Sequence, residues 1–243
     1  VYCPLADGGD ETLEILAYHS TLFKKESIAT TGPIAKQEVT ATYLTNTSKN
    51  IAVIEAAQAH GLVLLPNQVL EPMNSTSYGV GQIILHALNR LKPDKNKTLV
   101  ITLGGSSSTD GGLGALQALG YLFYDKDKRL IQEPLCGNLL YRVKHIETTA
   151  LNLKNTQVLI ATDVTNPLLG PQGTATIYGP QKGATPTHIQ QLDHELTGIK
   201  DLMIQALGVD HSALPGSGAA GGLGYGLKHL PNSSLCSGFD WLI

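Results

Sequence analysis

The spacing of apolar residues predicts alternating strands and helices along this chain. Apolar positions three and four apart indicate amphipathic helices, whereas short apolar or alternating runs indicate strands. The helical pattern covers residues 11–18, 77–91, 113–122 and 187–207, and the strand pattern covers residues 39–44, 51–57, 98–103 and 157–162. Strands that alternate with helices are typical of βαβ units, so we predict an α/β fold.

Composition narrows the classes of protein that the chain can represent. Its 243 residues suit one large domain or two small ones, and 42% hydrophobic against 15% charged residues indicates a packed core. A net charge of −3 does not suggest a nucleic-acid or anionic membrane partner. No apolar run reaches the roughly 18 residues of a membrane span. The scattered Cys3, Cys136 and Cys236 favour a reducing compartment such as the cytoplasm.

The most informative motif is a Gly/Ser turn between the predicted strand 98–103 and the helix that follows. It reads Gly104, Gly105, Ser106, Ser107, Ser108, Thr109, Asp110, Gly111 and Gly112. Glycines allow a close backbone approach, and N–H groups at a helix start favour an anion. The hydroxyls of residues 106–109 add donors, so we predict an anion-binding pocket. The alternative is a simple helix cap made by Thr109 or Asp110.

Carboxylates mark two further candidate sites. Asp163 stands at the end of the predicted strand 157–162, where ligands bind in open α/β sheets, and Asn166 follows it in the same loop. Asp7 and Asp10 open the first predicted helix and suit Mg²⁺ or a substrate hydroxyl. Ordinary turn and helix capping is the alternative at both places.

Four other polar residues are weaker candidates. Lys182, between two glycine-bearing turns, is either a phosphate contact or a solvated surface lysine. Ser217 belongs to a Gly/Ser segment, residues 214–224, which is either a second phosphate cradle or a stripe for close helix packing. Thr76 precedes a predicted helix, so its hydroxyl either binds substrate or caps that helix. Glu55 ends an apolar run, a setting in which a carboxylate needs a partner or a shifted pKa.

Taken together, these motifs resemble the class I glycerate kinase family of bacteria. The matching stretches are residues 5–9 (LADGG), 54–62 (IEAAQAHGL), 76–81 (TSYGVG), 103–114 (LGGSSSTDGGLG), 162–170 (TDVTNPLLG), 178–186 (YGPQKGATP) and 214–224 (LPGSGAAGGLG). They follow the family order with similar spacing across nearly the whole chain. The ordered set is far more specific than any single motif.

The resemblance implies ATP-dependent phosphorylation of D-glycerate, usually at the 2-hydroxyl, with Mg²⁺. It also implies two α/β domains with the site in the cleft between them. One would be Rossmann-like and built from both chain ends, and the other, a three-layer α/β domain with a mixed sheet, would be inserted in it. On that basis we expect residues 1–45 to be a remnant of the Rossmann-like domain, residues 46–235 to be the inserted domain, and residues 236–243 to begin the return.

The chain departs from the family pattern at its ends. The Ala-Pro-Asp-Ser-Phe-Lys-Gly type start and the later Gly-Glu-Gly-Arg and Gly-Lys-x-Pro motifs are absent, and the usual Gly-Gly-Glu-Gly-Thr is here residues 8–12, GGDET. We therefore expect more protein to belong outside both ends, and an isolated chain of this length to be inactive.

Chemistry assigns roles to the candidates. Asp163 or Asp110 would orient or deprotonate the glycerate hydroxyl, and Asp7 with Asp10 would hold Mg²⁺. The Gly104–Gly112 turn and Lys182 would bind phosphate or the glycerate carboxylate. We expect D-glycerate as the small-molecule partner, with a homodimer as a candidate assembly.

Two rival hypotheses remain open at the level of sequence. One is a kinase of a related hydroxy acid. The other is a non-catalytic module that binds a carboxylate or a nucleotide. A reading frame that carries the missing ends would favour the enzyme, and one that stops at Ile243 would favour the binding module.

Overall fold

A six-stranded mixed sheet forms the centre of the molecule. The computed structural model describes residues 12–148 and 151–238, and the strand order is β1-β2-β3-β4-β7-β8. The strands are β1 (Lys24–Thr31), β2 (Glu38–Asn46), β3 (Ile51–Glu55), β4 (Lys97–Thr102), β7 (Thr156–Ala161) and β8 (Ser233–Cys236). The first three pair antiparallel, and β3, β4, β7 and β8 run parallel. The predicted α/β class with a mixed sheet is confirmed.

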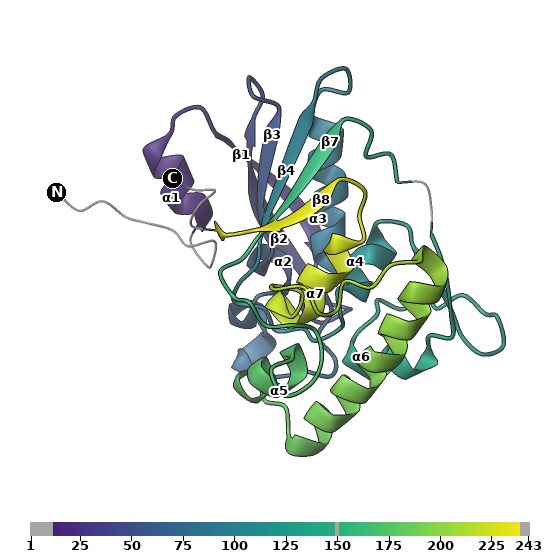
Figure 1. Cartoon of the computed structure of the whole chain (residues 1–243). Helices are drawn as coiled ribbons and strands as arrows, with labels where there is room; N and C mark the ends of the chain where they lie inside the picture. Colours follow the sequence, from purple (N-terminus) through teal and green to yellow (C-terminus); the bar gives the residue numbers. More distant parts are fainter. Residues whose placement is uncertain (1–11, 149–150, 239–243) are drawn as a thin grey trace.

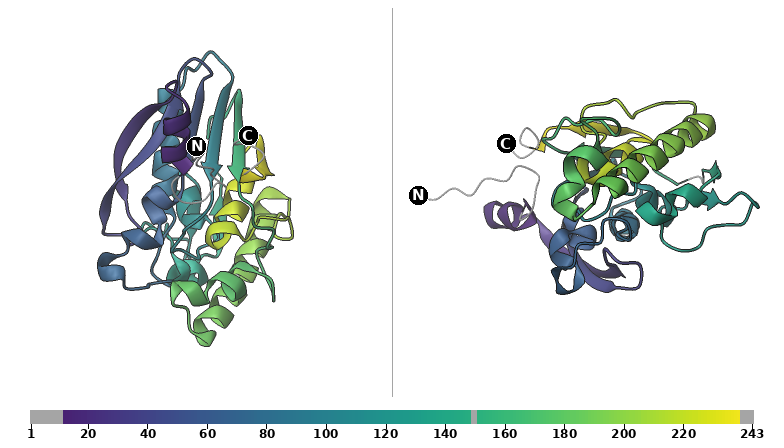
Figure 2. Two further views of the ribbon diagram at one scale, coloured as in Figure 1. Left: turned by 90° about the vertical axis from the view of Figure 1, so that its left-hand side faces the viewer. Right: turned by 90° about the horizontal axis from the view of Figure 1, so that it is seen from below.

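Helices cover both faces of this sheet (Figures 1 and 2). They are α1 (Thr12–His19), α2 (Ala57–His60), α3 (Tyr78–Arg90), α4 (Leu113–Ala118), α5 (Thr174–Tyr178), α6 (Pro186–Leu207) and α7 (Ala219–Lys228). Four 3₁₀ turns are η1 (Leu62–Leu64), η2 (Pro66–Gln68), η3 (Gly137–Arg142) and η4 (Pro180–Lys182). No helix in the described part of the chain is both long and apolar enough to cross a membrane.

Alternation along the central strands divides the core into two layers. Ile54 and Ile101 point to the larger core, which includes residues from α3, α4, α6 and α7. Val53 and Val100 point to the opposite face, where Leu13 of α1 packs. Successive side chains of a strand point to opposite faces, so near-continuous apolar runs are what a sheet covered on both sides requires.

The helix predicted over residues 113–122 is longer than the helix in the structure. Helix α4 ends at Ala118, and residues 122–124 form a short strand, β5 (Leu122–Tyr124). The cause is Gly120, whose φ is +101°. Its N–H donates to the Gln117 carbonyl, while the N–H of Tyr121 donates to the Leu116 carbonyl. This pair of bonds is a Schellman motif, which ends a helix.

The first predicted domain boundary falls within a strand of the sheet. Residue 45 lies inside β2, whose residues Leu44–Asn46 pair with β3. Residues 24–46 therefore share a sheet with the segment that follows them. The division into residues 1–45, 46–235 and 236–243 stays a prediction.

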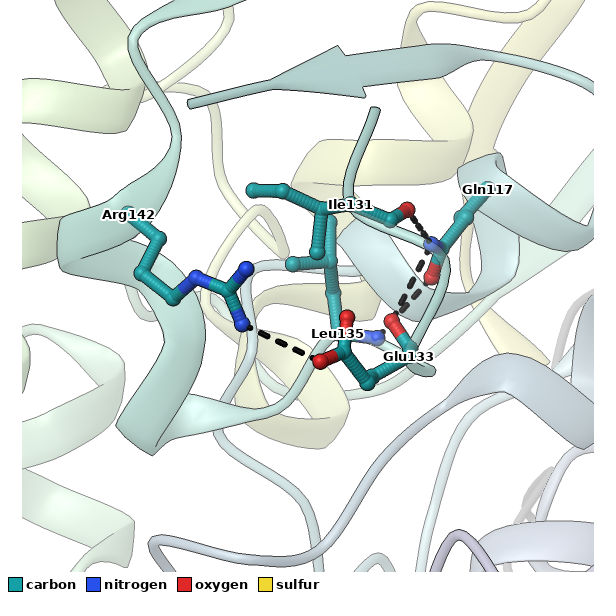
Figure 3. A network of polar contacts seen from close by, with 5 residues as sticks. All are labelled: Gln117, Ile131, Glu133, Leu135 and Arg142. Carbon is teal, nitrogen blue, oxygen red and sulfur yellow. Dashed lines mark hydrogen bonds and ion pairs between the residues drawn. The ribbon is translucent and has the colours of Figure 1, made fainter. Parts of the chain in front are cut away.

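A long connection between β5 and β6 (His145–Glu147) is held to α4 by one side chain (Figure 3). The Gln117 amide group donates to the carbonyls of Ile131 and Glu133, at 2.9 and 3.1 Å, and accepts from the N–H of Leu135 at 2.9 Å. Arg142 forms an ion pair of 3.3 Å with the Glu133 side chain nearby. Three bonds to backbone groups make Gln117 the principal polar link.

Replacing Gln117 with Leu should loosen this connection. Leucine keeps the volume but leaves three backbone groups without partners, at a cost of about 1–3 kcal/mol for each one that stays buried. Limited proteolysis within residues 125–144 should therefore be faster in Gln117→Leu. Arg142→Ala is the matched control, because an exposed ion pair contributes only about 0–1 kcal/mol. Equal proteolysis rates in the two variants would contradict this role for Gln117.

Candidate functional site

The carboxyl ends of four parallel strands lie in one row. Glu55 of β3 is level with Thr102 of β4, Thr102 with Ala161 of β7, and Ala161 with Cys236 of β8. The residues just beyond these strand ends therefore gather at a single edge of the sheet. That edge carries the Gly104–Gly112 turn after β4, Asp163 after β7 and Ser237 after β8. In open α/β sheets, ligands bind at this edge.

Asp163 lies beside a cavity at the ends of β7 and β8. The cavity has a volume of about 370 Å³ and is lined by residues 162–165, Pro215 and residues 235–237. Asp163 is exposed, and its Oδ1 atom accepts hydrogen bonds from the Ser237 hydroxyl at 2.8 Å and the Gly238 N–H at 3.0 Å. These two bonds orient an accessible carboxylate at the strand ends.

The Gly104–Gly112 turn has the backbone shape that its glycines suggest. Gly105, Gly111 and Gly112 all have positive φ, at 57°, 65° and 76°. Gly105 is exposed, and its carbonyl accepts from the N–H of Leu62. The turn therefore begins at the surface of the strand edge and then runs into the interior.

The hydroxyls of Ser107 and Ser108 point inward rather than to a ligand. The Ser107 hydroxyl donates to the His60 carbonyl at 2.9 Å, and the Ser108 hydroxyl lies 3.0 Å from the His60 Nδ1 atom. Both serines are buried, and Ser106 is 5% exposed. The turn has more hydroxyls than a helix cap needs, and those of Ser107 and Ser108 bond to buried groups of His60. Only the start of the turn, Gly104 to Ser106, remains placed to meet a ligand.

Lys182 is buried and is not a solvated surface lysine. It is 2% exposed, and its Nζ atom donates to the Ser106 hydroxyl at 2.9 Å and to the Ser108 carbonyl at 2.6 Å. Burial lowers the pKa of Lys182 to about 7, and the negative charge of Asp110 opposes that shift. Lys182 therefore binds the Gly/Ser turn directly.

His60 is part of the same buried network. Its side chain is 0% exposed, and its Nε2 atom has no hydrogen-bond partner among the described residues. Burial, aided by the charge of Lys182, lowers the pKa of His60 to about 3, so the imidazole is neutral. No spacing signal in the sequence pointed to it, because its partners lie 47 and 48 residues away.

Asp110 lies inside the protein. Its Oδ2 atom accepts from the Ser77 N–H at 2.8 Å and the Ser77 hydroxyl at 2.7 Å, and its Oδ1 atom accepts from the Gly112 N–H at 3.0 Å. Burial raises the pKa of Asp110, and these hydrogen bonds oppose the rise. The geometry joins the start of α3 to the turn before α4, which favours a structural role for this carboxylate over proton transfer.

The remaining described candidates bond mainly within the protein. Thr76 donates to the Leu135 carbonyl, and Ser217 donates to the His211 carbonyl. The Asn166 side chain donates to the Gln172 carbonyl and accepts from the Tyr178 hydroxyl. Glu55 is 5% exposed at the sheet edge and accepts from the N–H of Leu13 at 3.3 Å. Of these, Glu55 lies in the row of strand ends.

The Gly/Ser segment at residues 214–224 packs against the Gly104–Gly112 turn. A Cβ atom added to Gly221 would lie 1.9 Å from the Ser108 carbonyl oxygen, and one added to Gly222 would lie 2.8 Å from the Cα of Gly111. The N–H of Gly111 also donates to the Gly221 carbonyl at 3.0 Å. Of the two interpretations of this segment, close packing accounts for its small residues.

The predicted metal ligands Asp7 and Asp10 lie outside the described residues. Within residues 12–148 and 151–238, no three His, Cys, Asp or Glu side chains are grouped so that they could hold a metal ion. Mg²⁺ is commonly bound through one or two carboxylates together with substrate phosphates. The exposed carboxylate of Asp163 is compatible with that mode.

The chain is an α/β protein with an accessible carboxylate and a glycine turn at the carboxyl edge of its mixed sheet, the edge at which ligands bind in open α/β folds. Comparison with known proteins gives the family. The glycerate kinase family model matches residues 1–243, so the chain belongs to the glycerate kinase family.

Individual relatives agree with this assignment. The chain is 36% identical over 242 residues to the glycerate 2-kinase of Escherichia coli K12 and 33% identical over 242 residues to the glycerate kinase of Halalkalibacterium halodurans. These alignments cover 99% of this chain but 61% and 62% of the two relatives. A crystal structure described as glycerate kinase 2 from Salmonella typhimurium LT2 superposes with a TM-score of 0.89 at 36% identity, covering 99% of this chain and 63% of that one. The chain thus spans about three fifths of the length of the curated relatives it matches.

Proposed function

We propose that the protein to which this chain belongs transfers a phosphoryl group from ATP to D-glycerate, with the 2-hydroxyl as the acceptor. The family assignment and the names of its relatives support this activity. The structural observation that carries it is the position of Asp163, an exposed carboxylate oriented by Ser237 and Gly238 beside a cavity of about 370 Å³.

Phosphoryl transfer depends on positioning and charge neutralisation more than on covalent chemistry. In this proposal Asp163 accepts a hydrogen bond from the glycerate hydroxyl, orients it and takes its proton as the new O–P bond forms. The backbone at Gly104 and Gly105 meets an oxyanion of the substrate. Mg²⁺ would neutralise phosphate charge in this reaction, and Asp7 and Asp10 are its candidate ligands.

We also propose a two-domain organisation for the protein. Residues 46–235 would be the inserted domain, and residues 1–45 and 236–243 would belong to a Rossmann-like domain whose other parts line the opposite side of the cleft. The few scattered cysteines, Cys3, Cys136 and Cys236, support a cytoplasmic setting. A homodimer is the candidate assembly.

A turnover assay tests the activity directly. The full-length product of the reading frame and the 243-residue chain should each be incubated with MgATP and D-glycerate, and the products identified by ³¹P NMR. We expect 2-phosphoglycerate from the full-length protein. L-Glycerate and glycolate are the matched acceptor controls. Binding of D-glycerate or ATP without turnover by the full-length protein would favour the non-catalytic module, and turnover of another hydroxy acid alone would favour the related kinase.

A further inference from the structure

The buried ammonium group of Lys182 contacts the one turn that is proposed to meet a substrate anion. Lys182 ends η4, and Gly183, with φ +86°, closes this turn through its N–H bond to the Pro180 carbonyl. The lysine side chain crosses to the Gly/Ser turn and donates to the Ser106 hydroxyl and the Ser108 carbonyl. Two short bonds over a sequence separation of more than 70 residues fix the turn to this lysine.

Among the residues that the structure describes, Lys182 has no oppositely charged partner at bonding distance. No described carboxylate lies within 4.0 Å of its Nζ atom. The charged or titratable groups facing it are Asp110, whose oxygens accept from Ser77 and Gly112, and His60, which is neutral. Buried charges in proteins are normally paired, because an unpaired ion loses its hydration without compensation. A bound anion would supply the missing countercharge.

The hydroxyl of Ser106 links the buried ammonium group of Lys182 to the surface by hydrogen bonding. Because its oxygen accepts from Lys182, its own proton remains available for donation. Ser106 is 5% exposed and follows Gly105, which is exposed with φ +57°. A hydroxyl polarised by an ammonium group donates a stronger hydrogen bond than an isolated one.

We propose that Lys182 is a positioning residue with two roles. Its ammonium group holds the Gly104–Gly112 turn in place through Ser106 and Ser108. The same positive charge polarises the Ser106 hydroxyl, which donates a hydrogen bond to an oxyanion of the substrate. The inference rests on the proposed function only in taking a phosphate or the glycerate carboxylate as that oxyanion. Lys182 itself acts through Ser106 and does not touch the substrate.

Anion binding should then be coupled to protonation of Lys182. In the free protein burial lowers the pKa of this group to about 7. A nearby anion favours the charged form and raises the pKa, so binding takes up a proton. Because the anion binds the protonated form, the apparent affinity scales with the protonated fraction and should fall about five-fold between pH 7 and pH 8.

Isothermal titration calorimetry of the full-length protein measures this coupling. The probes are sulfate, whose charge is constant over this range, and D-glycerate, each titrated at pH 7 and pH 8 in two buffers of different ionisation enthalpy. We expect proton uptake with both probes, larger at pH 8. Binding without proton uptake by the unmodified protein would overturn the proposal, and this readout needs no variant.

Two substitutions locate the effect. Lys182→Met, which keeps the length of the side chain without its charge, should weaken anion binding about ten-fold or more at pH 6 and abolish the pH dependence. Ser106→Ala keeps the ammonium group and should weaken binding while proton uptake persists. Lys126→Met, at an exposed lysine of the turn after β5, is the matched control and should behave as the unmodified protein. Unchanged affinity in Ser106→Ala would refute the route through its hydroxyl, even if Lys182→Met failed to fold.

The two probes separate this inference from the proposed function. Proton uptake with sulfate, but no binding of D-glycerate, would support Lys182 and reject the substrate. Phosphorylation of D-glycerate with no proton uptake would keep the activity and reject the role of Lys182.

Discussion

Gly221→Ala should unfold much of the molecule at temperatures at which the unmodified chain is stable. The new Cβ atom would lie 1.9 Å from the Ser108 carbonyl oxygen, and Gly221 has a φ of +73°, which an L residue adopts only with strain. Two backbone segments would have to separate, and with them the bond between Gly111 and Gly221. We expect a loss of roughly 4 kcal/mol or more in the free energy of unfolding. For a chain of this size that lowers Tm by about 10 °C or more in a thermal melt followed by circular dichroism.

Alanine substitutions at Gly208 and Gly198 are controls that distinguish the steric clash at Gly221 from the effect of backbone strain. Gly208 also has a positive φ, +75°, but a Cβ atom there would meet nothing within 4 Å. Gly208→Ala should therefore cost only about 1 kcal/mol. Gly198 lies inside α6 with open space and no positive φ, so Gly198→Ala should stabilise the helix by up to about 1 kcal/mol. Similar Tm values for Gly221→Ala and Gly208→Ala would show that close packing at Ser108 is unimportant.

The elements that sequence predicted best are those with a long or wholly apolar pattern. Strand β4 and helices α3 and α6 lie within one or two residues of their expected bounds, because their periodicity reports burial directly. Strand β1 had no such signal. Its residues, KKESIATT, are mostly exposed or half-buried, and the strand exists through its backbone pairing with β2 at the edge of the sheet. Edge pairing leaves little trace in a hydrophobic pattern.

The candidate site was predictable in position but not in orientation. A polar residue directly after a buried strand reaches the carboxyl edge by chain direction alone, and in the structure Gly104 and Asp163 both follow strands that end at this edge. Which way a side chain then points depends on partners distant in sequence. The bonds from Ser108 to His60 and from Ser106 to Lys182 span 48 and 76 residues, so no local pattern announces them. The inward direction of the Ser108 hydroxyl and the contact of the Ser106 hydroxyl with Lys182 follow from these tertiary contacts.

Substitution by asparagine should affect the two predicted catalytic carboxylates differently. It should lower stability at Asp110 and kcat at Asp163. Asp110→Asn keeps one acceptor oxygen but places an NH₂ group against N–H or O–H donors from Ser77 or Gly112. Leaving such buried groups unsatisfied should cost about 3 kcal/mol in the free energy of unfolding, measured by urea denaturation. Any loss of activity should follow the loss of folded protein.

Asp163→Asn should leave stability within about 0.5 kcal/mol of the unmodified protein, because Asp163 is exposed and asparagine can still accept from Ser237 and Gly238. Asparagine cannot take the glycerate proton, so kcat for D-glycerate should fall by about 10²–10⁴. An unchanged kcat would remove Asp163 from the catalytic set. If Asp110→Asn were as stable as the unmodified protein but had a low kcat, Asp110 would be the better candidate for the base. The loss of activity could then not be explained by loss of folded protein.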